Sequence, residues 1–210
     1  MNAKSKLVAL AISLLSMAAV SSAHADTINF DDINLVPNDY QALGTNYHGF
    51  SWNNFLALDT TGVFYSPSGF QPGTLSGDNI GYNAFGNDAS FSSTTAFTLN
   101  SFYLTSAWRD GLTVTVTGTG NGGALFSQTL TPSATAATKY TLDWADINSV
   151  MFHATGGTKH AGFANIDGTQ FALDNITFNA AAVPEPESYA MLLAGLGMMG
   201  FVGRRRRRAG

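Results

Sequence analysis

Cysteine is absent from this chain of 210 residues, and glutamate occurs only at Glu185 and Glu187, close to the C-terminus. Without cysteine the fold has no disulfide bond, so its stability rests on the hydrophobic core and on any metal ion that it holds. Without a glutamate before residue 185, the two opposed carboxyl groups of a glycosidase would have to be aspartates, and no motif marks a pair. We therefore expect a protein that is not an enzyme. A secreted polysaccharide hydrolase that works with aspartates is the alternative.

Basic residues are equally scarce in the middle of the chain. Between Asp26 and Ala182 there are twelve aspartates but only Arg109, Lys139 and Lys159, a formal charge of −9. A surface of this sign repels phosphate groups and anionic headgroups. Nucleic acid and anionic lipid are therefore not expected as partners of this part of the chain.

The N-terminus has the layout of a secretory signal peptide. Two lysines precede the apolar run Leu7–Val20, and the small residues Ala23 and Ala25 flank a histidine at its end. The run is shorter than the ~20 residues of a spanning helix, which disfavours the alternative of a retained anchor. We expect residues 1–25 to be removed by signal peptidase after Sec-type export, so that the mature chain begins at Asp26.

The C-terminus carries a second signal with three parts. A Pro/Glu motif is followed by the apolar stretch 189–202 and then by a cluster of arginines. An apolar helix of this length is marginal as a permanent anchor, and the arginines would keep their end on the cytoplasmic side. The residues of the motif and the cluster are Val183, Pro184, Glu185, Pro186, Arg204, Arg205, Arg206, Arg207 and Arg208.

This arrangement over residues 183–208 resembles the PEP-CTERM sorting signal of Gram-negative bacteria. The resemblance implies recognition by the membrane enzyme exosortase, with cleavage near Pro184–Pro186. It also implies a chain that is held at the membrane by its C-terminal helix and is then found at the cell surface or outside the cell. In that family the sorting system accompanies exopolysaccharide and biofilm production. The signal indicates where the protein is sent but not what it does.

The middle domain, residues 26–182, reads as β-structure. The run Leu112–Thr117 alternates apolar and hydroxyl side chains, as a half-buried strand does. The glycine-rich run Gly118–Gly123 matches a nucleotide-binding spacing, but a strand and not a helix follows it, so it predicts a hairpin connection. The pattern predicts an all-β fold, an antiparallel β-sandwich of the jelly-roll type. The expected strands are Ala96–Thr105, Leu112–Thr117, Ala124–Leu130, Ser149–His153 and Gln170–Phe178.

The same domain more loosely resembles exported jelly-roll domains related to carbohydrate-binding modules. The resemblance rests on Ile28–Asp32 at the start, Tyr47–Trp52 soon after and Phe171–Phe178 at the end. It implies the sandwich fold and, more weakly, sugar binding.

A calcium site is predicted where the first and last strands of such a fold meet. Asp31 and Asp32 would then approach Asp174 and Asn175, and carboxylate and amide oxygens are ligands that calcium prefers. The site would be structural. The alternative is that these residues only form strand-end turns that face water.

Aromatic residues are the candidates for ligand binding. Trp108 and Tyr82 stand beside turn-forming residues and could offer flat faces to sugar rings, although large aromatics more often fill a sandwich core. The sequence thus favours an exported envelope or matrix protein that binds exopolysaccharide. A purely structural protein that associates only with its own copies remains a further alternative.

Overall fold

The structure, a computed structural model, describes residues 25–120 and 122–179. The predicted apolar helix 189–202, the sorting motif and the signal peptide up to residue 24 lie outside these ranges. The elements, in chain order, are β1 (Asp26–Ile28), β2 (Tyr40–Ala42), β3 (Ser51–Asn53), β4 (Phe55–Asp59), α2 (Phe70–Gly73), β5 (Asn79–Asn83), the 3₁₀ turn η2 (Ala84–Gly86), β6 (Ala89–Ser106), β7 (Arg109–Gly120), β8 (Gly123–Leu130), β9 (Thr138–Lys159) and β10 (Phe171–Phe178).

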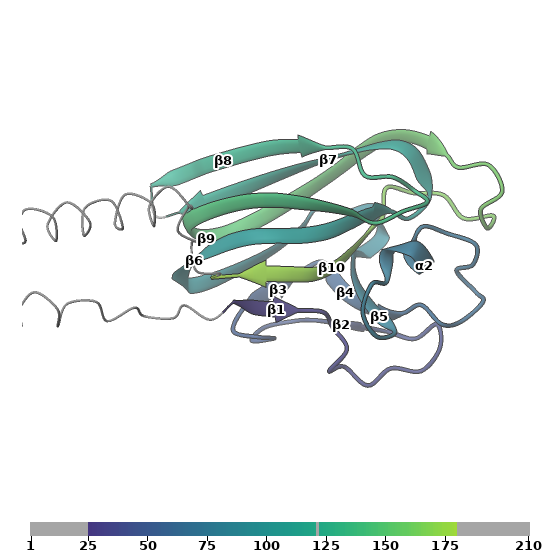
Figure 1. The fold of residues 1–210 in the computed structure, drawn as a ribbon, viewed down its shortest axis with the longest axis horizontal. Coiled ribbons are helices and arrows are strands. Elements are labelled where there is room, and N and C mark those ends of the chain that lie inside the picture. Colours follow the sequence, from purple (N-terminus) through teal and green to yellow (C-terminus); the bar gives the residue numbers. More distant parts are fainter. Residues whose placement is uncertain (1–24, 121, 180–210) are drawn as a thin grey trace, which may run out of the picture. The chain divides into compact units, whose positions relative to one another are not determined.

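The strands in the described part of the chain pair antiparallel and belong to one hydrogen-bonded sheet, in the order β2-β4-β5-β10-β6-β9-β7-β8 (Figure 1). The long strands β6 and β9 take part in two layers. Their segments 97–104 and 138–147 pair with each other beside β10, whereas segments 89–92 and 149–152 pair beside β3 and β7. The predicted all-β sandwich is therefore confirmed.

The two long strands change layer at irregular positions. Register shifts interrupt the β6–β9 ladder between Ser92 and Ser101. On the opposite strand Asp143 and Asp146 have positive φ values of 50° and 58°. Bulges of this kind bend a strand and increase its twist, so they let one continuous strand leave one layer and enter the next.

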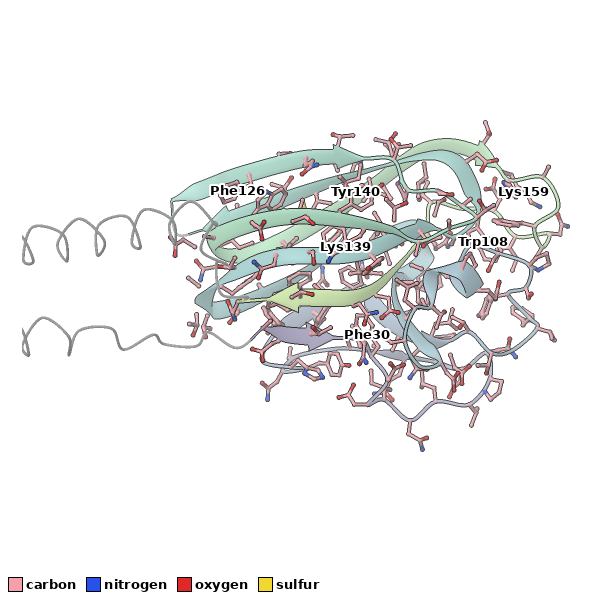
Figure 2. All side chains as sticks on the ribbon, in the orientation of Figure 1. Phe30, Trp108, Phe126, Lys139, Tyr140 and Lys159 are labelled. Carbon is pink, nitrogen blue, oxygen red and sulfur yellow. The ribbon has the colours of Figure 1, made fainter. Side chains whose placement is uncertain are left out.

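The core lies between the layers and is rich in phenylalanine. Phe152 of β9 is fully buried, and its ring centroid lies 5.5 Å from those of Phe102 in β6 and Phe171 in β10. A second cluster forms around Leu58, Phe70 and Trp108, at the end of the sandwich where Figure 2 labels Trp108. Phe70 belongs to α2, so this short helix closes that end of the core.

All five strands predicted from the sequence correspond to observed strands; four are longer than predicted, and β10 begins one residue later, at Phe171. The expected hairpin at Gly118–Gly123 is confirmed, because Gly120 pairs with Gly123 across the β7–β8 turn. The expected meeting of first and last strands is also confirmed, since β1 pairs with β10 from Asp26 opposite Phe178. The strands that the pattern did not predict are β1 to β5, which have three to five residues each.

These strands and both hydrophobic clusters lie within one compact unit. Because its core is complete, we expect the segment 26–182 to fold on its own. Across residues 25–120 and 122–179, no helix has the length and hydrophobicity needed to cross a membrane.

Candidate functional site

An aromatic pocket opens at the α2 end of the sandwich. Its volume is about 200 Å³, and nine side chains line it, from strands β2, β4 and β5, from α2 and η2, and from loops. Three of its walls are the exposed or partly exposed rings of Tyr40, Tyr82 and Phe85, and Phe85 is 84% exposed. The complete lining is Tyr40, Leu58, Tyr65, Phe70, Tyr82, Phe85, Trp108, Ile166 and Gln170.

The strand register places the first wall. Tyr40 of β2 pairs with Leu58 of β4, and Leu56 of β4 pairs with Tyr82 of β5. Leu58 itself belongs to the buried cluster beneath the pocket. Tyr40 and Tyr82 thus lie on the two strands that flank β4, and the hydrogen-bonded sheet fixes their relative positions.

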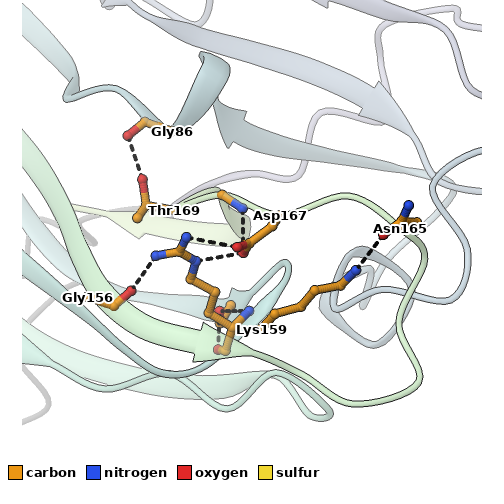
Figure 3. Close-up of polar contacts among 9 residues, drawn as sticks. Gly86, Gly156, Lys159, Asn165, Asp167 and Thr169 are labelled. Atoms are coloured by element: carbon orange, nitrogen blue, oxygen red, sulfur yellow. Dashed lines mark hydrogen bonds and ion pairs between the residues drawn. The ribbon is translucent and has the colours of Figure 1, made fainter.

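The turn that carries Phe85 is fastened to the loop after β9 (Figure 3). The hydroxyl of Thr169 donates to the carbonyl of Gly86 over 2.9 Å. The buried amide of Asn83 donates to the carbonyls of Asn87 (3.0 Å) and Thr169 (3.3 Å). Phe85 has φ 55°, an uncommon conformation for a large side chain. These contacts hold the turn in that conformation and keep the ring of Phe85 at the pocket mouth.

An arginine holds the other side of the same loop. The Arg109 guanidinium donates from Nε to Asp167 Oδ1 (2.7 Å) and from Nη2 to Asp167 Oδ2 (3.0 Å), and from Nη1 to the carbonyl of Gly156 (3.0 Å) (Figure 3). This bidentate pair raises the pKa of Arg109 and lowers the pKa of Asp167, through the hydrogen bond between them. Asp167 lies between Ile166 and Gln170, so Arg109 positions both of these lining residues.

The floor of the pocket is a chain of ring contacts. The ring of Phe70 lies edge-on to Trp108 at 5.4 Å and to Tyr82 at 5.6 Å. Trp108 is 1% exposed, so it forms the base and is no open platform. Tyr82 is half-buried and presents part of its ring to the pocket. The structure thus brings together the two residues that the sequence selected as ligand-binding.

Polar groups converge on this aromatic surface. Burial raises the pKa of Tyr82, and the neighbouring phenols of Tyr65 and Tyr40 raise it further; burial and Tyr40 likewise raise the pKa of Tyr65. The phenols therefore stay protonated at neutral pH and can donate hydrogen bonds. The side-chain oxygen of Gln170 is buried and has no hydrogen-bond partner within the part of the chain that the structure describes. This oxygen packs against Gly168, where an added Cβ would come within 2.2 Å of it.

The predicted calcium residues lie on two sides of the segment Leu75–Asn79. Asp174 is fully buried and accepts hydrogen bonds from the backbone amides of Leu75 (2.8 Å) and Ser76 (3.2 Å). Burial raises the pKa of Asp174 to about 6; these amides oppose the rise and the charge of Asp31 adds to it. Asn175 Oδ1 accepts from the Ser76 hydroxyl over 3.1 Å.

Asp31 approaches the same segment from the other side. Its carboxylate packs on Gly77, where an added Cβ would come within 2.1 Å of Oδ1. It accepts from the backbone amides of Asp78 (3.2 Å) and Asn79 (3.3 Å). Asp31 thus lies near enough to Asp174 for its charge to raise the pKa of that carboxyl group. The basic side chains in the described ranges contact other partners: Arg109 pairs with Asp167, Lys139 lies over the ring of Tyr103, and Lys159 donates to Asn165.

Asp32 points elsewhere. It accepts from the hydroxyl of Tyr47 over 2.6 Å and contacts Nε2 of His48 at 3.0 Å. In the described ranges no three His, Cys, Asp or Glu side chains are grouped so that they could hold a metal ion. Oxygen donors from Asp31, Asp174 and Asn175 nevertheless suit a hard cation chemically, so calcium remains a prediction.

A larger cavity, of about 570 Å³, lies at the opposite end, between Asp26 and Asn179. Serine, threonine and backbone groups make up much of its lining, together with the buried rings of Phe50, Phe97 and Phe178. It offers no exposed aromatic face, which distinguishes it from the pocket at the α2 end.

Sequence reasoning missed several lining residues. The sequence did not predict Phe85 or Gln170 as residues of a binding site. Tyr40 lies in a strand too short to be predicted. One signal was available for Phe85: a large aromatic inside the turn-forming run Asn83–Asn87 has little room to be buried.

Comparison with known protein families confirms the sorting signal that the sequence predicted at the C-terminus. The PEP-CTERM protein-sorting motif matches residues 182–208. The motif implies export, a C-terminus held at the membrane before processing, and exosortase as the processing partner. A search of curated proteins gave no match.

Solved structures resemble the β-domain only distantly. One is a DUF4465 family protein from Bacteroides ovatus, with 10% identity and a TM-score of 0.45, over 75% of this chain and 99% of that one. Another is TmCBM61 in complex with beta-1,4-galactotriose, with 9% identity and a TM-score of 0.34, over 63% and 88%. A third is the CBM22-1–CBM22-2 tandem domain of Paenibacillus barcinonensis Xyn10C, with 13% identity and a TM-score of 0.39, over 80% and 49%.

Proposed function

We propose that this chain is an exported, exosortase-processed protein of the cell envelope or extracellular matrix that binds exopolysaccharide without degrading it. The observation that carries the proposal is the aromatic pocket at the α2 end, which partly exposed rings and the side chain of Gln170 line. Sec-type export and signal peptidase cleavage before Asp26 would deliver the domain to the compartment where such a polymer is found.

The chemistry of the pocket suits a sugar. A sugar ring has apolar C–H faces that pack on aromatic rings, and hydroxyl groups around its rim that need hydrogen-bond partners. Tyr40 and Phe85 supply exposed rings, while Tyr65, Tyr82 and Gln170 supply polar side chains to the lining. The volume of about 200 Å³ lies below the ~300–1,000 Å³ of pockets for drug-sized ligands, so we expect it to hold a single sugar unit of a longer chain.

The acidic surface limits which polymers can bind. With a formal charge of −9 on residues 26–182, a strongly anionic polysaccharide would be repelled at low ionic strength. The pocket lining contains no charged side chain. We therefore expect a neutral sugar unit in the pocket.

The test is co-sedimentation of purified residues 26–182 with exopolysaccharide from the producing bacterium, with and without calcium. We expect retention by the polymer. Phe85→Ala should weaken retention about fivefold, because one ring contact contributes about 1 kcal/mol. Phe64→Ala is the matched control, because Phe64 is also exposed (67%) but does not line the pocket.

Three results would contradict the proposal. Free passage of the wild-type domain under both conditions would remove the sugar-binding claim. Time-dependent release of small sugars would favour the hydrolase that works with aspartates. Equal loss of binding in Phe85→Ala and Phe64→Ala would mean that the pocket is not the site.

A further inference from the structure

Strand β8 forms a long free edge of the sheet. Among the described residues it pairs with β7 alone, from Leu130 opposite Val114 to Gly123 opposite Gly120. It lies at the upper left of Figure 1. Every second residue of an edge strand directs its backbone N–H and C=O away from its neighbour, so β8 presents a row of backbone groups to pair.

The other edges of this fold are protected. Strands β1, β2 and β3 have only three residues each. The segment 138–147 of β9, which pairs only with β6, carries Lys139 and the bulged residues Asp143 and Asp146. Short length, charge and bulges are the usual means by which natural sheets prevent pairing with another chain. Strand β8 is longer, with eight residues, and none of them is charged. Its ladder with β7 has a register shift between Phe126 and Ala124, and the pairing from Phe126 to Leu130 is regular.

Charge is also distributed so that this edge is left neutral. Residues 111–138, which contain β8 and most of β7, include no charged side chain, although residues 26–182 carry twelve aspartates. Among the described side chains of β8, Ser127, Gln128 and Thr129 are exposed, and the ring of Phe126 stacks on Trp144 with the ring centroids 5.3 Å apart. Two copies of an acidic domain repel each other over most of their surfaces, but they can approach at a neutral edge.

We infer that β8 pairs antiparallel with β8 of a second copy of this chain, about a twofold axis. An antiparallel pair of identical strands satisfies the outward backbone groups of both copies at once, and the interface is self-complementary. The layer β3-β6-β9-β7-β8 then continues across two domains. The pairing is independent of sugar binding; where both occur, a dimer presents two pockets to one polymer and gains avidity.

The first test is sedimentation equilibrium of residues 26–182 over a range of concentrations. We expect reversible association to a dimer. Thr129→Glu should weaken the dimer about tenfold, because the added charge occurs twice in a symmetric interface between acidic domains. Thr141→Glu is the matched control: it makes the same change at an exposed position of β9, and it should leave association unchanged.

The absence of cysteine permits a second test. Ser127→Cys introduces a single thiol near the middle of β8, and Thr141→Cys introduces one in the control position. A short bis-maleimide should join Ser127→Cys chains into dimers and leave Thr141→Cys chains as monomers. Monomeric wild-type protein at all concentrations, or equal behaviour of the β8 variants and their controls, would overturn the inference.

Discussion

The buried carboxyl group of Asp174 makes a quantitative prediction about pH. Its pKa is raised from 3.8 to about 6 by burial, against the opposing effect of backbone amides. A raised pKa means that the folded state holds a proton that the unfolded chain has already lost. The stability that this proton provides is complete below about pH 4 and is lost as the pH rises through about 6.

The size of the effect follows from the same values. At about 1.4 kcal/mol per pH unit, the difference between 3.8 and about 6 corresponds to about 3 kcal/mol in the limit of low pH. Between pH 7.5 and pH 4, near the unfolded value, we expect about 2 to 3 kcal/mol of this to appear in the free energy of unfolding. Asp174 is fully buried, so solvent screening does not reduce this free energy.

The assay is urea unfolding of residues 26–182 in calcium-free buffer at several pH values, followed by tryptophan fluorescence. The reference is Asp174→Asn, which cannot ionise. The effects of all other groups on stability are common to both proteins and cancel in the difference. Asparagine also replaces one acceptor oxygen with a donor, which shifts its stability by a constant amount at every pH.

The expected result is that wild type gains about 2 to 3 kcal/mol relative to Asp174→Asn as the pH falls from 7.5 to 4. Asp31→Asn removes the like charge beside Asp174, so it should reduce the gain without abolishing it. Parallel pH profiles for wild type and Asp174→Asn would refute the reasoning, because they would mean that Asp174 has the same pKa in both states.

Three further predictions test other parts of the structure. Calcium should raise the melting temperature of wild type but not of Asp174→Asn, since the ion would hold the ionised carboxylate; equal melting in calcium and in chelator would remove the predicted site. Phe152→Ala should cost about 3 to 5 kcal/mol in chemical denaturation, because it leaves a cavity between the layers; a cost below about 1 kcal/mol would contradict the packing described. Arg109→Ala should change stability by less than about 1 kcal/mol, because its ion pair is partly exposed, yet it should weaken polysaccharide retention by releasing the loop before Gln170; unchanged retention would show that the loop needs no such support.

Local pattern predicted much of this fold because the signals of a half-buried strand are local. The alternation in Leu112–Thr117 is visible without knowledge of any partner, and the glycines that follow it mark the hairpin. Strands β1 to β5 are too short to show a period, and they exist because long neighbouring strands pair with them. Of strand β9, only Ser149–His153 was predicted. The bulges at Asp143 and Asp146 interrupt the alternating pattern of the rest of the strand.

The candidate site was less accessible to prediction. Trp108 and Tyr82, the two residues selected from the sequence, both line the pocket, but Trp108 is buried beneath its surface. Tyr40, Phe85 and Gln170 are separated by long stretches of sequence, and nothing local indicates that they meet. Their convergence depends on the β2-β4-β5 register and on the hydrogen bonds that fasten η2 to the loop after β9.

The sequence by itself determined the sorting signal, the all-β character and the scarcity of glutamate and cysteine. Signal segments and strand periodicity are properties of contiguous residues, and composition needs no structure. The tertiary structure decided which aromatics form a pocket, which aspartate is buried with a raised pKa, and which strand edge remains free. These depend on contacts between residues far apart in the chain, and the strand order and the depth of burial that create them are set only when the two layers close on the phenylalanine core.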